Sequence, residues 1–119
     1  SSDNGEKSEA KKKIGIVAMV ENGAFTDMKE GILEELEAKG YTEDTADIDY
    51  QCASGDATAL STIVSNMTDG TYDVVFTIAT PPTQAFVNVE SDTPVFFCAV
   101  SAPVESGILS DHCYLIIII

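Results

Sequence analysis

Apolar and polar residues follow one another along this chain in blocks that predict strands and helices in alternation. Five segments are rich in apolar and β-branched residues, as strands are, and these are 14–20, 46–53, 72–79, 94–100 and 113–119. Three segments between them carry apolar residues at the spacing of a helix face, and these are 25–36, 60–67 and 80–89. The segment 101–111 is loop-like, so the predicted order is β-α-β-α-β-α-β-loop-β.

Strands that alternate with helices predict a parallel sheet covered by helices on both faces. We therefore expect an α/β fold, a three-layer Rossmann-like open sheet. The runs 14–20 and 74–79 are almost wholly apolar, which is typical of central strands. That pattern predicts the strand order 2-1-3-4-5. Residues 14–119 form one predicted lobe, and the polar residues 1–13 are predicted to be a flexible leader.

The final segment, Cys113–Ile119, has no charge and ends in four isoleucines. Such a segment aggregates when it is exposed, so we expect it to be covered as a fifth strand. The strand can join the sheet of its own chain or, by exchange, that of a second copy. A second copy could also cover the face that a second lobe would cover, so we predict a homodimer in which exchange of the tail is the less favoured variant; a monomer that completes its own sheet is the alternative. Cys52 and Cys98 fall on the second and fourth strands, too far apart for a disulfide bond.

The net charge of the chain limits the classes of partner that it is expected to bind. The chain has 20 Asp and Glu against 6 Lys, has no Arg, and carries a formal net charge of -14. Nucleic-acid binding requires cationic side chains around phosphates, so we expect no nucleic-acid partner. One histidine, His112, and three widely spaced cysteines also argue against a metal site.

Ligands of open parallel sheets bind beyond the carboxyl ends of the strands. The loops at these ends carry five candidate ligand-binding residues, namely Glu21, Asn22, Thr80, Thr83 and Ser101. The chain contains no phosphate-binding loop, no dinucleotide fingerprint, no nucleophile elbow and no nucleophile–base pair. We therefore predict neither a catalytic residue nor a cofactor, and the chain is not expected to be an enzyme.

Three of the candidate residues also have a structural interpretation. Glu21 is suited to receive an ammonium group, or it is a solvated loop charge. Thr80 either binds a ligand or caps the third helix. Ser101 either adds a hydroxyl group to a site or begins a turn. From the residues alone these alternatives stay open.

Four separated motifs carry a family resemblance: IGIVAMVENGAFTDMKEGILEELEAKGY, QCASGD, FTIATPPTQAF and PVFFCAVSAPVESGIL. In this order they resemble the substrate-binding lipoproteins of ABC transporters of the tryptophan/tyrosine-binding type, which have the type I periplasmic-binding-protein fold. The resemblance ends near Leu109 and implies that this chain corresponds to the first of the two lobes of such proteins. It implies an amino-acid-like ligand, aromatic amino acids among the candidates, whose amino group faces Glu21 and whose carboxylate faces the third helix start.

The resemblance further implies an ABC permease as a partner and an extracytoplasmic protein, lipid-anchored in its precursor. Three of the motifs depart from the family pattern: VEHPA is VENGA, TPAAQ is TPPTQ, and TDPV is SAPV, so that Ala102 replaces a carboxylate. Two alternatives remain beside this interpretation. One is a flavodoxin-like enzyme or signalling domain, and the other is a remnant that oligomerises without a ligand.

Overall fold

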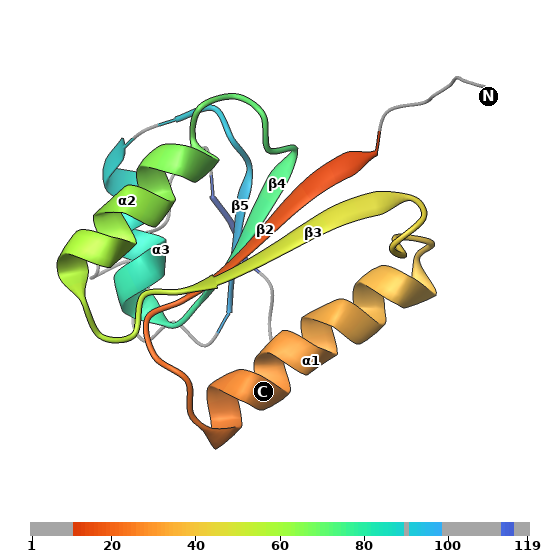
Figure 1. Ribbon diagram of the computed structural model, residues 1–119, viewed down its shortest axis with the longest axis horizontal. Coiled ribbons are helices and arrows are strands. Elements are labelled where there is room, and N and C mark those ends of the chain that lie inside the picture. Colours follow the sequence, from red (N-terminus) through yellow and green to blue (C-terminus); the bar gives the residue numbers. More distant parts are fainter. Residues whose placement is uncertain (1–10, 90, 99–112, 116–119) are drawn as a thin grey trace.

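The computed structural model describes residues 11–89, 91–98 and 113–115, and it has an α/β fold (Figure 1). Its strands are β2 (Lys12–Ala18), β3 (Ala46–Cys52), β4 (Val74–Ile78), β5 (Val95–Cys98) and β6 (Cys113–Leu115). Its helices are α1 (Gly23–Ala38), α2 (Ala57–Met67) and α3 (Thr80–Val89). Each helix connects two successive strands, as the alternating pattern predicted.

The described strands form one parallel sheet in the order β3-β2-β4-β5-β6. In chain order this is second, first, third, fourth and fifth, so the predicted strand order is confirmed. Helix α1 covers one face of the sheet, and α2 and α3 cover the other (Figure 1). The molecule therefore has the three layers of a doubly wound fold, with β2 and β4 side by side at its centre.

Each face of the sheet has its own hydrophobic core, because alternate strand residues point to opposite faces. The buried cluster under α1 contains Ile14, Ile16, Ala18, Ile32, Leu36, Ala46, Phe76 and Ile78. The cluster under α2 and α3 contains Val17, Ala53, Leu60, Val64, Met67, Val75, Phe86 and Val95. The central strands thus contribute side chains to both cores, which explains why their sequences are continuously apolar.

Short polar residues fix the ends of the helices. The Asn22 side chain caps α1 by accepting the N–H of Phe25 at 2.8 Å. Asp56 caps α2 by accepting two N–H groups of its first turn, which confirms the predicted cap. After α1, Gly40 takes a φ of 96°, a value that favours glycine. These caps set where each helix leaves its strand.

Strand β2 begins two residues earlier than the apolar run at Ile14. Lys13 donates its backbone N–H to Asp73 at 2.8 Å, and its ammonium group lies 4.9 Å from the centre of the Tyr72 ring. These contacts hold Lys13, a residue of the predicted leader, within the sheet. Ser101 and residues 116–119 lie outside the described residues, and the predicted homodimer stays a prediction.

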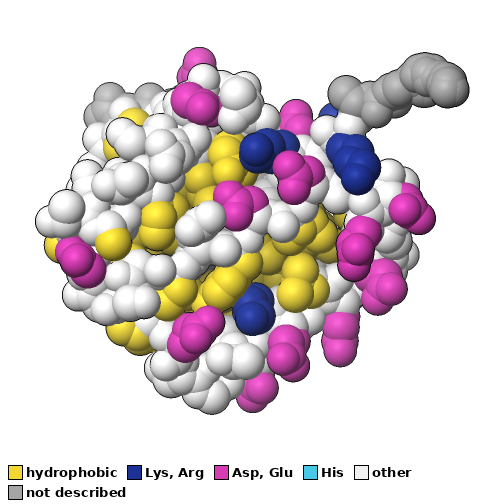
Figure 2. All heavy atoms as spheres, viewed as in Figure 1, with side chains coloured by type: hydrophobic (Ala, Val, Ile, Leu, Met, Phe, Trp, Pro, Cys, Tyr) yellow, Lys and Arg dark blue, Asp and Glu magenta, His cyan; other side chains and the backbone are white. Residues whose placement is uncertain are grey.

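Strand β3 is an edge of the described sheet, and its sequence alternates acidic and apolar residues. Asp47 and Asp49 separate Ala46, Ile48 and Tyr50. Figure 2 shows apolar side chains across the middle of this view, with acidic side chains among and around them. Charges on an edge strand oppose pairing with a further strand. The thiol of Cys52 at the end of β3 is free, as predicted.

Two glycines in different surroundings give a test of this packing. A Cβ at Gly15, in β2, would lie 2.6 Å from Sδ of the buried Met67, whereas a Cβ at Gly31, in α1, would meet nothing within 4 Å. We expect Gly15→Val to lower the free energy of unfolding by about 1–3 kcal/mol through overpacking. We expect Gly31→Ala to raise it by about 0.5–1 kcal/mol, because alanine is the better helix former. Urea unfolding of both variants measures the contrast, and equal effects would contradict the described packing.

Candidate functional site

The loops that follow β2 and β3 are joined at the carboxyl edge of the sheet. The N–H of Ala53 donates to the carbonyl of Ala18 at 2.9 Å, and the N–H of Gly55 donates to the carbonyl of Met19 at 2.8 Å. The second bond depends on a turn in which Ser54 and Gly55 have φ values of 55° and 80°. This bracing gives the loop after β2, which carries Glu21 and Asn22, a defined path.

Glu21 and Asn22 do different things in that loop. The side-chain oxygen of Asn22 caps α1, so this residue has a structural role in the fold. The exposed Glu21 accepts a hydrogen bond from the hydroxyl of Tyr50 at 3.0 Å. The Lys29 ammonium lies 4.4 Å from the centre of the same tyrosine ring. Tyr50 therefore connects the candidate carboxylate to β3 and to α1.

The environment of Tyr50 favours its neutral form. Burial raises the pKa of the Tyr50 hydroxyl well above its usual 10.0, and the hydrogen bond to Glu21 raises it further. Tyr50 therefore stays a hydrogen-bond donor throughout the physiological range. Because β3 and β4 pair with opposite edges of β2, this bond draws the Glu21 carboxylate toward the β3 side of its loop.

The end of β4 is strained where α3 begins. Ala79 follows Ile78 with a φ of 75°, which a residue with a Cβ rarely adopts. Such strain costs about 1–3 kcal/mol and clusters at functional sites. Thr80 is the first residue of α3, and the next two are Pro81 and Pro82. Prolines have no N–H, so Pro81 and Pro82 offer an anion no backbone donor at this helix start.

Thr83 supports this helix start from within the core. Its side chain is fully buried, its hydroxyl donates to the carbonyl of Ala79 at 2.8 Å, and its Oγ1 lies 2.6 Å from Oγ1 of Thr77. A hydroxyl group has one proton. Since Thr83 gives its proton to Ala79, Thr77 donates to Thr83. This chain of hydrogen bonds fastens the strained residue to β4.

The structure places four of the five predicted site residues. Glu21 and Asn22 share the loop after β2, and Thr80 and Thr83 share the first turns of α3 after the adjacent strand β4. Ser101 lies outside the described residues. The sequence analysis missed Tyr50 and Thr77, which position Glu21 and Thr83. The alternation of side chains along β3 and β4 was the available signal for these two residues. It does not reveal their contacts, which join residues 29 and 6 positions apart in the sequence.

Two further features of the described part of the chain concern metal ligands and membrane-spanning helices. It has no group of three His, Cys, Asp or Glu side chains placed to hold a metal ion. None of its helices is long and apolar enough to cross a bilayer.

Comparison with known proteins finds a family model that matches the chain. Residues 13–113 match the family model described as ABC transporter substrate binding protein, which reaches past Leu109, where the motif resemblance ends. Over 111 residues the chain is 35% identical to a protein of Clostridioides difficile (strain R20291) named tyrosine-binding protein. That match covers 91% of this chain and 32% of the relative, so the chain spans about a third of the length of this curated relative.

Solved structures agree with the fold. A domain from Streptococcus pneumonia in complex with L-Trp superposes with a TM-score of 0.84 at 24% identity, covering 91% of this chain and 39% of that one; at this identity the match shows the fold alone. The ligand-free, open structure of a substrate binding protein with adhesive properties from Clostridium difficile gives 0.82 at 32% identity, covering 87% and 38%. A conserved domain protein from Vibrio cholerae gives 0.83 at 27% identity, covering 89% and 38%.

The buried threonine pair has a measurable role. We expect Thr83→Val to lower the free energy of unfolding by about 1–3 kcal/mol, because the Ala79 carbonyl and the Thr77 hydroxyl lose their partner without a change in volume. The double variant Thr77→Val/Thr83→Val should lose less than the two single variants added together, since it removes both hydroxyl groups. Urea unfolding of the four proteins completes the cycle. Additive losses would show that the two hydroxyls act independently.

The raised pKa values of Tyr50 and Tyr72 predict that the protein loses stability in alkali. Burial, followed by hydrogen bonds to Glu21 and Asp49 respectively, raises the pKa of Tyr50 and of Tyr72 above the usual 10.0. Above about pH 10 the unfolded chain therefore releases phenolic protons that the folded chain keeps, and the free energy of unfolding falls. Tyr50→Phe/Tyr72→Phe should show a shallower fall between about pH 9 and pH 11 in urea unfolding. Equal slopes for the two proteins would contradict the described contacts.

Proposed function

We propose that this chain, which belongs to the ABC transporter substrate-binding protein family, supplies one half of a binding site for an amino acid with an aromatic side chain. The ligand class rests on the curated relative named tyrosine-binding protein and on the L-Trp complex of a protein with the same fold. We expect the chain to bind and release its ligand unchanged, since membership of this family favours transport over catalysis.

The observation that carries the proposal is a pair of opposite polar ends on adjacent central strands. The loop after β2 carries the Glu21 carboxylate, and α3 begins directly after β4 with Thr80 as its first residue. An amino acid has an ammonium and a carboxylate group, which these two ends complement. The sheet reverses its connection order between β2 and β4, where ligands of such sheets bind.

Each candidate residue has a role in this proposal. Glu21 receives the ammonium group, and a carboxylate can accept it on Oε1 while Oε2 keeps the bond from Tyr50. Asn22 fixes the start of α1, and Thr83 fixes the strained start of α3 where Thr80 meets the ligand carboxylate. Ser101 is proposed to add a hydroxyl group from the loop after β5.

One lobe is expected to bind weakly. Small-molecule sites usually bury about 70–90% of the ligand, and the chain offers one side of such a site. The whole assembly that we propose closes a second lobe over the ligand. It delivers the ligand to an ABC permease outside the cytoplasm, where the precursor is lipid-anchored through its polar leader. A homodimer of this chain is also proposed.

Ligand binding is best measured by nuclear magnetic resonance, because weak complexes remain visible. We expect L-tyrosine and L-tryptophan to shift the amide signals of residues 20–23 and 79–80 in the 15N-labelled chain, with a dissociation constant on the order of 1 mM. L-leucine tests the preference for an aromatic ring. N-acetyl-L-tyrosine, which lacks the ammonium group, tests the role of Glu21.

Glu21→Gln should weaken L-tyrosine binding about tenfold, equivalent to about 1.4 kcal/mol, by removing the charge that receives the ammonium group. Glu34→Gln removes the same charge from the exposed side of α1 and should leave binding unchanged. Signals that move elsewhere in the chain, or two variants with equal affinity, would refute the proposed site.

A further inference from the structure

We propose that Tyr50 determines the specificity of the proposed ligand site by keeping Lys29 away from Glu21, so that the Glu21 carboxylate stays available to the ammonium group of a ligand. Tyr50 is a positioning residue in this inference, since it acts on the ligand through Glu21. The inference rests on the proposed function, in which Glu21 receives that ammonium group. A carboxylate already paired within the protein distinguishes less well between a ligand with an ammonium group and one without it.

Tyr50 contacts the two charged side chains with different parts of its own side chain. Its hydroxyl donates to Oε2 of Glu21 at 3.0 Å, and the Lys29 ammonium lies over its ring, 4.4 Å from the ring centre. The hydroxyl group lies in the plane of the ring, whereas a cation is attracted to the face of the ring. One tyrosine therefore holds an anion and a cation in different directions.

The surroundings of Lys29 leave Glu21 as an acidic partner within its reach. Residues three and four positions apart on a helix are neighbours. The neighbours of Lys29 on α1 carry no acidic group, and they are Phe25, Thr26, Ile32 and Leu33. A lysine has a flexible four-carbon stem, and Glu21 shares the contact with Tyr50. Without the tyrosine, we expect the Lys29 ammonium to move to the Glu21 carboxylate.

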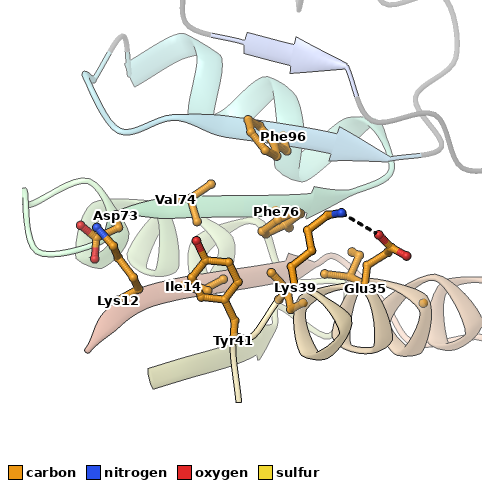
Figure 3. Close-up of a pocket in the computed structure, with 12 residues that line it drawn as sticks. Lys12, Ile14, Glu35, Lys39, Tyr41, Asp73, Val74, Phe76 and Phe96 are labelled. Carbon is orange, nitrogen blue, oxygen red and sulfur yellow. Dashed lines mark ion pairs between the residues drawn. The ribbon is translucent and has the colours of Figure 1, made fainter. Parts of the chain in front are cut away.

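Two other lysines in the described part of the chain pair with acidic side chains near them. Lys39 lies 3.4 Å from Glu35, one turn away on α1 (Figure 3). Lys13 of β2 lies 3.8 Å from Asp47, its partner on β3. No such ion pair joins Lys29 to Glu21, although both residues are described and both contact one tyrosine. This separation of charges is what the inference assigns to Tyr50.

Tyr72 provides an internal comparison for Tyr50. Lys13 lies over the Tyr72 ring, 4.9 Å from its centre, and the Tyr72 hydroxyl donates to Asp49 at 2.5 Å. Both tyrosines are half-buried, but Tyr72 packs on the core under α2 and α3, whereas Tyr50 packs on the core under α1. Tyr72 is therefore a matched control with similar contacts on the opposite face of the sheet.

Tyr50→Leu is the decisive variant, because it removes both the face of the ring and the hydroxyl group. Lys29 then competes with the ligand for Glu21, and L-tyrosine should bind about threefold to fivefold more weakly, as expected for an exposed ion pair. The affinity for N-acetyl-L-tyrosine, which has no ammonium group, should change by less than about twofold. Tyr72→Leu should leave both affinities unchanged. Titrations followed by the amide signals of the 15N-labelled proteins measure these affinities.

Lys29→Met separates this effect from a loss of packing. In the Tyr50→Leu background it should restore most of the affinity for L-tyrosine, because the competing ammonium group is gone. In the otherwise unchanged chain it should alter the affinity by less than about twofold, since the ring already holds Lys29. Unchanged affinity in Tyr50→Leu, a loss that is equal for the two ligands, or a loss that Lys29→Met does not rescue would each overturn the inference.

A measurement without ligand separates this inference from the proposed function. Nuclear Overhauser effects between the Hε protons of Lys29 and the Hγ protons of Glu21 should be absent in the unchanged chain and appear in Tyr50→Leu. If L-tyrosine binds to none of these proteins, the proposed function fails. The appearance of the Lys29–Glu21 contact would then still support the separation of charges by Tyr50, and its absence in Tyr50→Leu would overturn it.

Discussion

A parallel sheet has to be covered on both faces, and this requirement governs the rest of the molecule. The central strands β2 and β4 place alternate side chains in two separate cores, so neither face tolerates water. The right-handed crossover then decides that α1 lies on one face and that α2 and α3 lie on the other. The described candidate ligand-binding residues lie beyond the strand ends, where the chain leaves the sheet.

At these ends the fold keeps two polar groups apart by fixing each to a different strand. Tyr50 holds Glu21 toward β3, whereas the hydroxyl chain from Thr77 through Thr83 holds Ala79 at the end of β4. Rigid elements position such groups better than free loops do. The backbone strain at Ala79 is tolerated because hydrogen bonds and two prolines define the turn that follows it.

The same sheet offers two surfaces with different chemistry. Its carboxyl edge combines a carboxylate with a helix start and suits a zwitterionic small molecule. Its α1 face is apolar and packs Ile14, Phe76 and Phe96 against the helix. Both surfaces share β2 and β4, so the packing under α1 also supports the strands that carry the proposed ligand site.

The alternation of apolar runs and helical stripes determined the element order, the α/β class, the strand order and the cap at Asp56, because these depend on local periodicity and on burial. Four ordered motifs were specific enough to indicate the family. Only the tertiary structure decided that Tyr50 bonds to Glu21 and that Thr83 is buried against Thr77, since these contacts join different elements through side-chain direction. The local pattern also predicted that β2 begins at Ile14. In the structure, hydrogen bonds to Thr45 and Asp73 extend the start of the strand to Lys12. A strand's end is set by the hydrogen bonds its neighbours offer, and the sequence of the strand itself does not contain them.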